Sequence, residues 1–322
     1  MKAFLIAAAL AFAQLAHGQD AYPTHPVTMI VPFPPGGVAD LTARAVAPVM
    51  EKALRQPIVA VNRTGAGGEV GYEAVAKAKP DGYTILMALS SVTIAPESHR
   101  LFDRQPKYEM KQLAPIALLS ADPTVLVVRA ESPYRSVKDF IDAAKANPAK
   151  INYSSSGVYG TLHVAMEMLA HAANVKLWHV PYQGAGPAIT ALLGGQVEAL
   201  ASGPSAIVTH IKSGKFRALG SWGAKRLAAL PDVPTFRELG YDVEFYIWAG
   251  MFAPAGTPDT VMKVLRDAAR QAANDPDFKA TMDKLATPIA YLDAPEFSSF
   301  VERDAKMLAA ALKRIGRIEE KK

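Results

Sequence analysis

The chain has 322 residues, of which 50% are hydrophobic and 20% are charged, and its formal net charge is +5 at pH 7. This length suits about two domains, and the lack of cysteine excludes disulfides, cysteine-bound metals and a cysteine-linked lipid anchor. The basic residues are scattered and do not cluster with aromatic residues, so the composition does not indicate nucleic-acid binding.

Residues 1–18 have the pattern of a secretory signal peptide. Lys2 precedes an unbroken apolar run, Ala3–Ala13, and the small residues Ala16 and Gly18 stand just before the expected cleavage point. A short membrane anchor is the alternative, but the run is too short to span a bilayer comfortably. We predict cleavage before Gln19 and export to the periplasm without a lipid anchor.

A strand, a glycine-rich turn and a helix follow one another near the start of the mature chain. Met29–Val31 is a short apolar strand, Pro34–Gly37 is the turn, and a helix begins at Val38 with Asp40 in its first turn. Pro48 should kink or split this helix. Unpaired backbone N–H groups at such a helix start can bind an anion. The alternative is an ordinary turn in which Asp40 serves only the helix dipole.

The same arrangement recurs along the chain. A second glycine-rich loop follows the predicted strand at 58–62, and a third strand, at 84–88, ends at two serines. Loops rich in Ser and Gly also follow strands predicted at 151–153, 177–182 and 197–201, each before a helix. Such loops gather at one edge of a parallel α/β sheet. Two sheets of this kind, facing each other, predict a clamp whose cleft is lined by helix N-termini.

The chain is predicted to change domain twice. A strong strand begins after Asp122 and Pro123, and the aromatic strand Val243–Phe252 is long enough to cross back. A helix is expected to end at 236–240, and helices at 259–274, 276–285 and 295–315 close the chain. We therefore predict an α/β fold in which residues 19–121 and 245–322 form the first domain and residues 122–244 form the second.

Eight strings occur in a specific order along the mature chain. They are IVPFPPGGVAD (30–40), NRTGAGGEVG (62–71), AKPDGYT (78–84), HVPYQGAGPA (179–188), LLGGQVEA (192–199), GKFRALG (214–220), LPDVPTFRELG (230–240) and APAGTP (253–258). With these strings the chain resembles the Bug-type extracytoplasmic solute receptors of tripartite tricarboxylate transporters. The resemblance implies a type II periplasmic-binding-protein fold, in which two α/β domains close on a hinge over a ligand in the cleft between them.

The resemblance also implies a ligand and a partner. The ligand would be a dicarboxylate, a tricarboxylate, an aromatic acid or an acidic amino acid, held by backbone N–H groups, hydroxyls and waters. The partner would be a membrane permease with one large and one small subunit. Departures from the family's usual pattern at Tyr159, Ser202 and Ala95 indicate that the ligand is unlike those of better-known members. The ring of Tyr159, among small residues, could stack on an aromatic or long-chain acid.

The predicted binding site draws on both walls of the cleft. In the first domain it comprises Phe33, Gly36, Gly37, Val38, Asp40, Ala66, Gly67, Ser90 and Ser91. In the second domain it comprises Ser155, Ser156, Gly157, Tyr159, Gly160, Thr161, Tyr182, Gln183, Gly184 and Ser202. Asp40 would bind a ligand ammonium or a bridging water if it is not purely structural. Trp248 is a candidate for closing the cleft, although an aromatic residue on a crossing strand is more often part of the core.

Two other functions are compatible with parts of this pattern. A serine of the loop Ser154–Thr161 with His163 as base would make a hydrolase, but the loop is not GxSxG and adjacent residues at a helix start rarely face each other. We expect His163 and His179 to be structural, and we predict no catalytic residue, metal or cofactor. A sensor that presents the same acid to a signalling partner would have the same sequence features. We expect a monomer.

Overall fold

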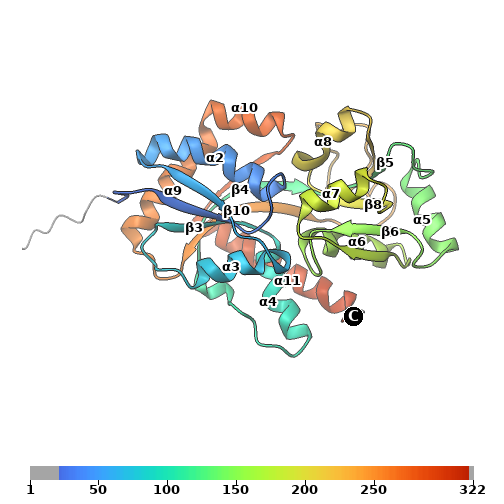
Figure 1. Cartoon of the computed structure of the whole chain (residues 1–322), viewed down its shortest axis with the longest axis horizontal. Helices are drawn as coiled ribbons and strands as arrows, with labels where there is room; N and C mark the ends of the chain where they lie inside the picture. Colours follow the sequence, from blue (N-terminus) through green and yellow to red (C-terminus); the bar gives the residue numbers. More distant parts are fainter. Residues whose placement is uncertain (1–21, 319–322) are drawn as a thin grey trace, which may run out of the picture.

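A computed structural model describes residues 22–318, so the predicted signal peptide at 1–18 lies outside the described residues. The described chain forms two lobes, each with its own sheet flanked by helices (Figure 1). The first lobe is on the left of the figure and holds the helix at the C-terminal end, while the second lobe is on the right. The two-sheet α/β arrangement agrees with the prediction.

The first lobe has a six-stranded sheet with the strand order β11-β4-β10-β3-β1-β2 in the described chain. Its strands are β1 (Val27–Val31), β2 (Ile58–Asn62), β3 (Thr84–Leu89), β4 (Leu113–Pro123), β10 (Tyr246–Pro254) and β11 (Ile289–Asp293). Its helices are α2 (Val38–Leu54), α3 (Glu69–Ala76), α4 (Ser91–Leu101), α9 (Asp259–Asn274), α10 (Pro276–Lys284) and α11 (Ala294–Ile315), with short 3-10 turns η1 (Ala66–Gly68) and η2 (Met110–Gln112). Because β1 pairs in parallel with both β2 and β3, the loops that follow these strands meet at one edge of the sheet.

The second lobe has a five-stranded sheet with the order β7-β6-β8-β5-β9 in the described chain. Its strands are β5 (Val125–Arg129), β6 (Asn152–Ser155), β7 (Trp178–Pro181), β8 (Ala199–Ser202) and β9 (Phe216–Ser221). Its helices are α5 (Val137–Ala146), α6 (Thr161–Ala172), α7 (Ala185–Leu193) and α8 (Pro204–Lys212). The strand β6 is parallel to β7 and β8, so their C-terminal loops also share an edge.

Two adjacent segments connect the lobes. Thr124 alone separates β4 in one sheet from β5 in the other, and the chain returns through Phe245 into β10. The N–H of Thr124 donates to the carbonyl of Phe245 (3.3 Å), and the N–H of Trp222 donates to the carbonyl of Thr124 (2.9 Å). A few residues at the ends of paired strands can absorb a rotation of one lobe against the other. The domain boundaries predicted at 121/122 and 244/245 lie beside these segments.

Trp248 lies in the core of the first lobe. Its ring is fully buried and packs against Phe297 and Phe300 at centroid distances of 5.6 and 6.0 Å. Its indole N–H donates to Asp304 Oδ2 on α11 (2.7 Å). The side chain therefore fixes α11 to the sheet, and of the two roles considered for Trp248 the structure favours the core.

Asp304 should make the stability of the protein depend on pH. Burial raises the pKa of its carboxyl from 3.8 to about 6, although the hydrogen bond from Trp248 acts in the opposite direction. Because the folded chain binds this proton more tightly than the unfolded chain, stability falls as the pH rises from about 4 to about 6. Asp304→Asn keeps an acceptor for Trp248 and removes the ionisation. We expect it to raise the free energy of unfolding at pH 7 by up to about 3 kcal/mol and to leave it nearly unchanged below pH 4. Denaturant unfolding at both pH values measures this, and an equal effect at both would contradict it.

Some elements differ from the sequence prediction. The helix α2 continues unbroken through Pro48, because Val46, Val49 and Met50 bury its inner face against the sheet. Residues 236–240 form turns instead of a helix end, with Gly240 at a positive φ of 86°. The elements α4, β4 and β11 were not predicted, and β4 contains prolines that local reasoning assigns to loops.

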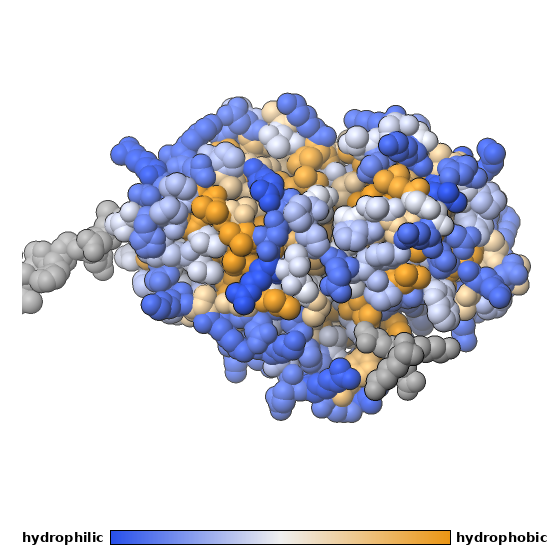
Figure 2. All heavy atoms as spheres, viewed as in Figure 1, coloured by the Kyte–Doolittle hydropathy of each residue, from blue (hydrophilic) through white to orange (hydrophobic). Residues whose placement is uncertain are grey.

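Hydrophilic residues separate the apolar areas on the face of the molecule that Figure 2 shows. The large hydrophobic side chains that are exposed come from scattered positions in the described chain: Val59, Val61, Trp178, Leu193, Leu239 and Met307. Among residues 22–318, none of the helices combines the length and the apolar character needed to cross a bilayer.

Candidate ligand-binding site

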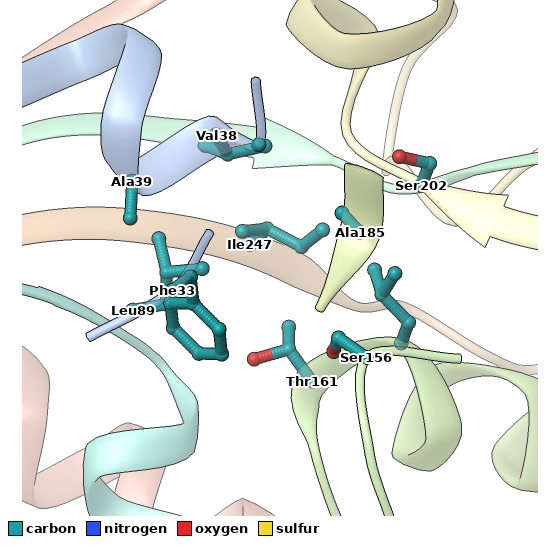
Figure 3. A pocket seen from close by; sticks show the side chains of 11 residues that line it. Phe33, Val38, Ala39, Leu89, Ser156, Thr161, Ala185, Ser202 and Ile247 are labelled. Atoms are coloured by element: carbon teal, nitrogen blue, oxygen red, sulfur yellow. The ribbon is translucent and has the colours of Figure 1, made fainter. Parts of the chain in front are cut away.

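A cavity of about 20 Å³ lies where the two lobes meet (Figure 3). The first lobe lines it with Phe33, Gly37, Val38, Ala39, Leu89 and Ile247, and the second lobe lines it with Ser156, Thr161, Leu162, Ala185 and Ser202. These residues come from loops that follow strands, from the helix starts beyond them and from the crossing strand β10. The cavity has room for about one water molecule. A four-carbon acid is larger, so the lobes must open to admit one, and closure around it requires the lining side chains to shift.

Four of the helices that begin around this cavity have a glycine at the N-cap, whereas α4, which begins beside Leu89, has Ser90 there. The N-cap residues of α2, α6, α7 and α8 are Gly37, Gly160, Gly184 and Gly203, and none of them supplies a side-chain cap. The backbone N–H groups in the first turns therefore have no competing acceptor from their own caps. Together with the positive ends of the helix dipoles, they can donate to an anion from both sides of the cleft.

Asp40 holds the first glycine-rich turn in shape. Its side chain is buried and accepts hydrogen bonds from Gly36 N (3.1 Å), Arg44 Nε (3.0 Å) and Asn62 Nδ2 (3.0 Å). Burial by itself would raise the pKa of this carboxyl, but these hydrogen bonds bring the pKa below its ordinary value. Asn62 Nδ2 also donates to the carbonyl of Phe33 (2.8 Å). Asp40 does not line the cavity, so the structure favours its structural role.

Two stacked histidines hold the serine-rich loop of the second lobe. The rings of His163 and His179 lie 3.9 Å apart and nearly parallel. His179 Nε2 lies 2.5 Å from Ser155 Oγ, and His163 Nδ1 accepts the N–H of Tyr159 (2.7 Å). Burial lowers the pKa of His179 to about 4 and the pKa of His163 well below its ordinary value, so both rings are neutral at pH 7. The predicted alternative of a serine paired with His163 is not formed, since Nδ1 of His163 accepts the N–H of Tyr159 and Ser155 contacts His179 instead.

Tyr159 contacts the C-terminal segment and does not line the cavity. Its hydroxyl donates to the carbonyl of Gly316 (3.0 Å) and accepts the N–H of Ile318 (2.7 Å). Its ring packs edge-on against Phe102 at the end of α4, with centroids 5.8 Å apart. The idea that this ring stacks on a ligand is therefore not supported by where the ring lies. Tyr159 instead links the serine-rich loop of the second lobe to residues of the first.

Several glycines lie where the two lobes touch. A Cβ atom built on Gly184 would lie 2.5 Å from Cδ of Pro34, and one built on Gly203 would lie 2.6 Å from Cγ2 of Val38. Gly157 likewise faces the backbone of Gly67, with a Cβ at 3.3 Å. A Cβ at 2.5 or 2.6 Å would force the opposing side chain to move, whereas one at 3.3 Å would require only a small shift of its neighbour. The glycines predicted to approach a ligand therefore also let the two walls of the cleft meet.

A buried carboxyl lies behind the cavity. Asp122, at the end of β4, is fully buried, and a Cβ built on Gly203 would lie 3.9 Å from its Oδ2. Burial raises the pKa of this carboxyl well above its ordinary value, which favours the protonated form. Asp122 does not itself line the cavity.

The structure brings part of the predicted site together. Six predicted residues line the cavity: Phe33, Gly37, Val38, Ser156, Thr161 and Ser202. Gly67, Gly157, Gly160 and Gly184 lie at the contact between the lobes, and Gly36 and Ala66 lie in the adjoining loops. Ser90 Oγ reaches Thr161 Oγ1 across the cleft at 3.5 Å. Ser91 is bonded to Tyr72 (2.7 Å), the hydroxyl of Tyr182 donates to Gln196 (3.3 Å), and Gln183 is exposed.

The sequence prediction missed the apolar part of the lining. Ala39, Leu89, Leu162, Ala185 and Ile247 line the cavity and were not named as site residues. All except Ile247 adjoin a predicted residue, so the loops were found while their apolar positions were overlooked. Ile247 comes from the crossing strand β10, whose aromatic neighbours were assigned to the core.

A family model described as the tripartite tricarboxylate transporter family receptor matches residues 42–317. The chain belongs to this family. It is 37% identical over 248 residues to protein BugT of Bordetella pertussis, a match that covers 76% of each chain. It also superimposes on the solved structure of the periplasmic binding protein BugD with a TM-score of 0.86 and 34% identity, covering 91% of this chain and 98% of BugD.

Two further receptor structures carry ligands. MatC from Rhodopseudomonas palustris, solved with bound malate, has a TM-score of 0.83 and 29% identity and covers 90% of this chain and 99% of its own. A second R. palustris protein, solved with adipate, has a TM-score of 0.86 and 26% identity and covers 91% of this chain and 98% of its own. These matches confirm the Bug-type resemblance and the two-lobe fold of periplasmic binding proteins. The family and the fold are those of solute-binding receptors, not of enzymes.

Proposed function

We propose that this receptor captures a small carboxylate between its lobes in the periplasm and delivers it to a tripartite tricarboxylate transporter permease. The observation that carries this proposal is the set of glycine-capped helix starts facing one cavity from both lobes. Their N–H groups can neutralise carboxylates without a basic side chain. The malate and adipate in the related structures support the same ligand class.

Each wall would take one end of the acid. The turn at Gly36, Gly37 and Val38 would hold one carboxylate at the start of α2, and the loop from Ser156 to Thr161 would hold the other at the start of α6. The lobes, residues 19–121 with 245–322 and residues 122–244, would rotate about the segments at Thr124 and Phe245. The mature protein would begin at Gln19 after cleavage of the signal peptide, and its scattered exposed hydrophobic residues support a monomer.

A thermal-shift screen of the mature chain tests this proposal. The panel contains dicarboxylates of four to ten carbons, citrate, aromatic acids and acidic amino acids, with succinamide as an uncharged control. The protein is first unfolded, dialysed and refolded to remove any co-purified ligand. A binder at about 100 times its Kd should stabilise the fold by about 2.7 kcal/mol and raise Tm by a few degrees. No shift with any acid, or an equal shift with succinamide, would contradict the proposal.

A further inference from the structure

The centre of the cavity is apolar. Seven of the eleven lining residues have hydrocarbon side chains, and none of the eleven is ionisable. The polar side chains among them, Ser156, Thr161 and Ser202, are all hydroxyls from the second lobe. Figure 3 shows Ile247 in the middle, between Val38 and Thr161, with the ring of Phe33 and Leu89 beside it. The middle of a bound acid would therefore face hydrocarbon.

This lining should favour binding of methylene groups over hydroxyl or ammonium groups on the ligand. A methylene group buried here gains about 0.8 kcal/mol, which is roughly fourfold in affinity. A hydroxyl or ammonium on the same carbon loses its hydrogen bonds to water, and the seven hydrocarbon side chains offer it no replacement. Only the hydroxyls of Ser156, Thr161 and Ser202, on the second-lobe wall, could bond it. Relatives have been solved with malate and with adipate, so the family itself does not decide between hydroxylated and unsubstituted acids.

We propose that this cleft selects dicarboxylates with an unsubstituted hydrocarbon body over acids that carry a hydroxyl or amino group. The inference rests on the proposed function, because it concerns the middle of an acid whose ends are held by the helix starts. Those starts recognise carboxylates of any dicarboxylate alike. Discrimination therefore comes from the residues between them.

Ile247 is the residue that would contact the middle of the ligand. It lies on β10, which belongs to neither carboxylate loop, and its side chain is almost fully buried. Its Cδ1 approaches the second lobe, since a Cβ built on Gly203 would lie 3.6 Å from it. The main chain of β10 at this position pairs with Asp122 of β4, which fixes where the side chain points. Changing Ile247 should alter selectivity while leaving the helix starts intact.

Titration calorimetry with matched acids tests the inference. The pairs are succinate with malate and glutarate with 2-hydroxyglutarate, which differ by one hydroxyl. In the wild-type protein we expect the unsubstituted member of each pair to bind at least tenfold more tightly. Ile247→Thr places a hydroxyl against the ligand and should reduce this ratio severalfold. Ile247→Val has the same shape as the threonine variant and should keep the wild-type ratio even where its affinity falls.

The outcomes separate the two proposals. If neither member of any pair binds, and the wider panel is also silent, the proposed function fails. If hydroxylated acids bind the wild-type protein as tightly as their partners, only the hydrocarbon preference is overturned. Equal ratios in the threonine and valine variants would also overturn the role of Ile247. Thermal melts establish that both variants fold, and the wild-type ratios decide the preference even if one does not.

Discussion

Replacing Gly37 with aspartate should abolish carboxylate binding and leave the protein folded. Gly37 is the N-cap of α2 at an ordinary φ of −91°, so the backbone accepts another residue. A Cβ there would lie 3.5 Å from Cβ of Ala185, which is a normal contact. An aspartate at an N-cap accepts N–H groups of the first helical turn and stabilises the helix. It would therefore occupy the donors proposed for the ligand and place a negative charge beside them.

The expected loss is at least a hundredfold in affinity, because like charges in contact cost several kcal/mol. Gly37→Asn is the matched control, since it has the same size and also caps the helix but carries no charge. We expect asparagine to weaken binding less than aspartate does, and both variants to melt at or above the wild-type temperature. Calorimetry with the tightest acid of the screen measures the effect. If Gly37→Asp binds the acid within tenfold of the wild-type affinity, the start of α2 does not bind the ligand.

The glycines that follow the strands predicted the parts of the site that depend on local backbone conformation. Gly36 and Gly37 follow an apolar strand and indicate that a helix, α2, begins there. In the second lobe Gly160, Gly184 and Gly203 likewise mark the starts of α6, α7 and α8. Parallel pairing then brings these loops to shared edges of the two sheets. The fold class and the loops of the cleft could therefore be deduced without coordinates.

Long-range contacts explain what the sequence did not predict. The strand β4 contains prolines, and its partners β10 and β11 lie more than a hundred residues further along the chain. Tyr159 stands in the left-handed region at φ 54°, and its hydroxyl contacts Gly316, 157 positions away. The exposure of Ile247 to the cavity likewise depends on how the lobes meet. No local pattern carries this information.

Asp40 illustrates a choice that only the structure makes. The sequence left two roles open, a contact with the ligand or a place in the first turn of a helix. Asn62 favours the structural role, because it lies at the end of a separate strand and donates hydrogen bonds both to Asp40 and to the carbonyl of Phe33. A carboxylate with three donors already in place has little capacity left for a ligand.

Replacing Gly203 with alanine should keep the protein folded and prevent the lobes from meeting. Gly203 has φ −69° and ψ 149°, a conformation open to alanine, so no backbone strain arises. Its Cβ would lie 2.6 Å from Cγ2 of Val38, across the cleft. Val38 is β-branched and has few alternative rotamers at the start of α2. The clash arises only when the lobes touch, so the cost falls on closure and not on the folding of either lobe.

Overpacking of this kind costs about 1–3 kcal/mol, so we expect the affinity of Gly203→Ala for a carboxylate to fall roughly 5- to 150-fold. Val38→Ala removes the opposing methyl group, and the double variant should bind more tightly than Gly203→Ala alone. Gly194→Ala is the control, because Gly194 also has a negative φ (−79°) and a Cβ there meets only its own helix. Calorimetry gives the affinities, and small-angle X-ray scattering with saturating ligand should show a larger radius of gyration for Gly203→Ala. Binding and scattering equal to those of Gly194→Ala would mean that this contact does not control closure.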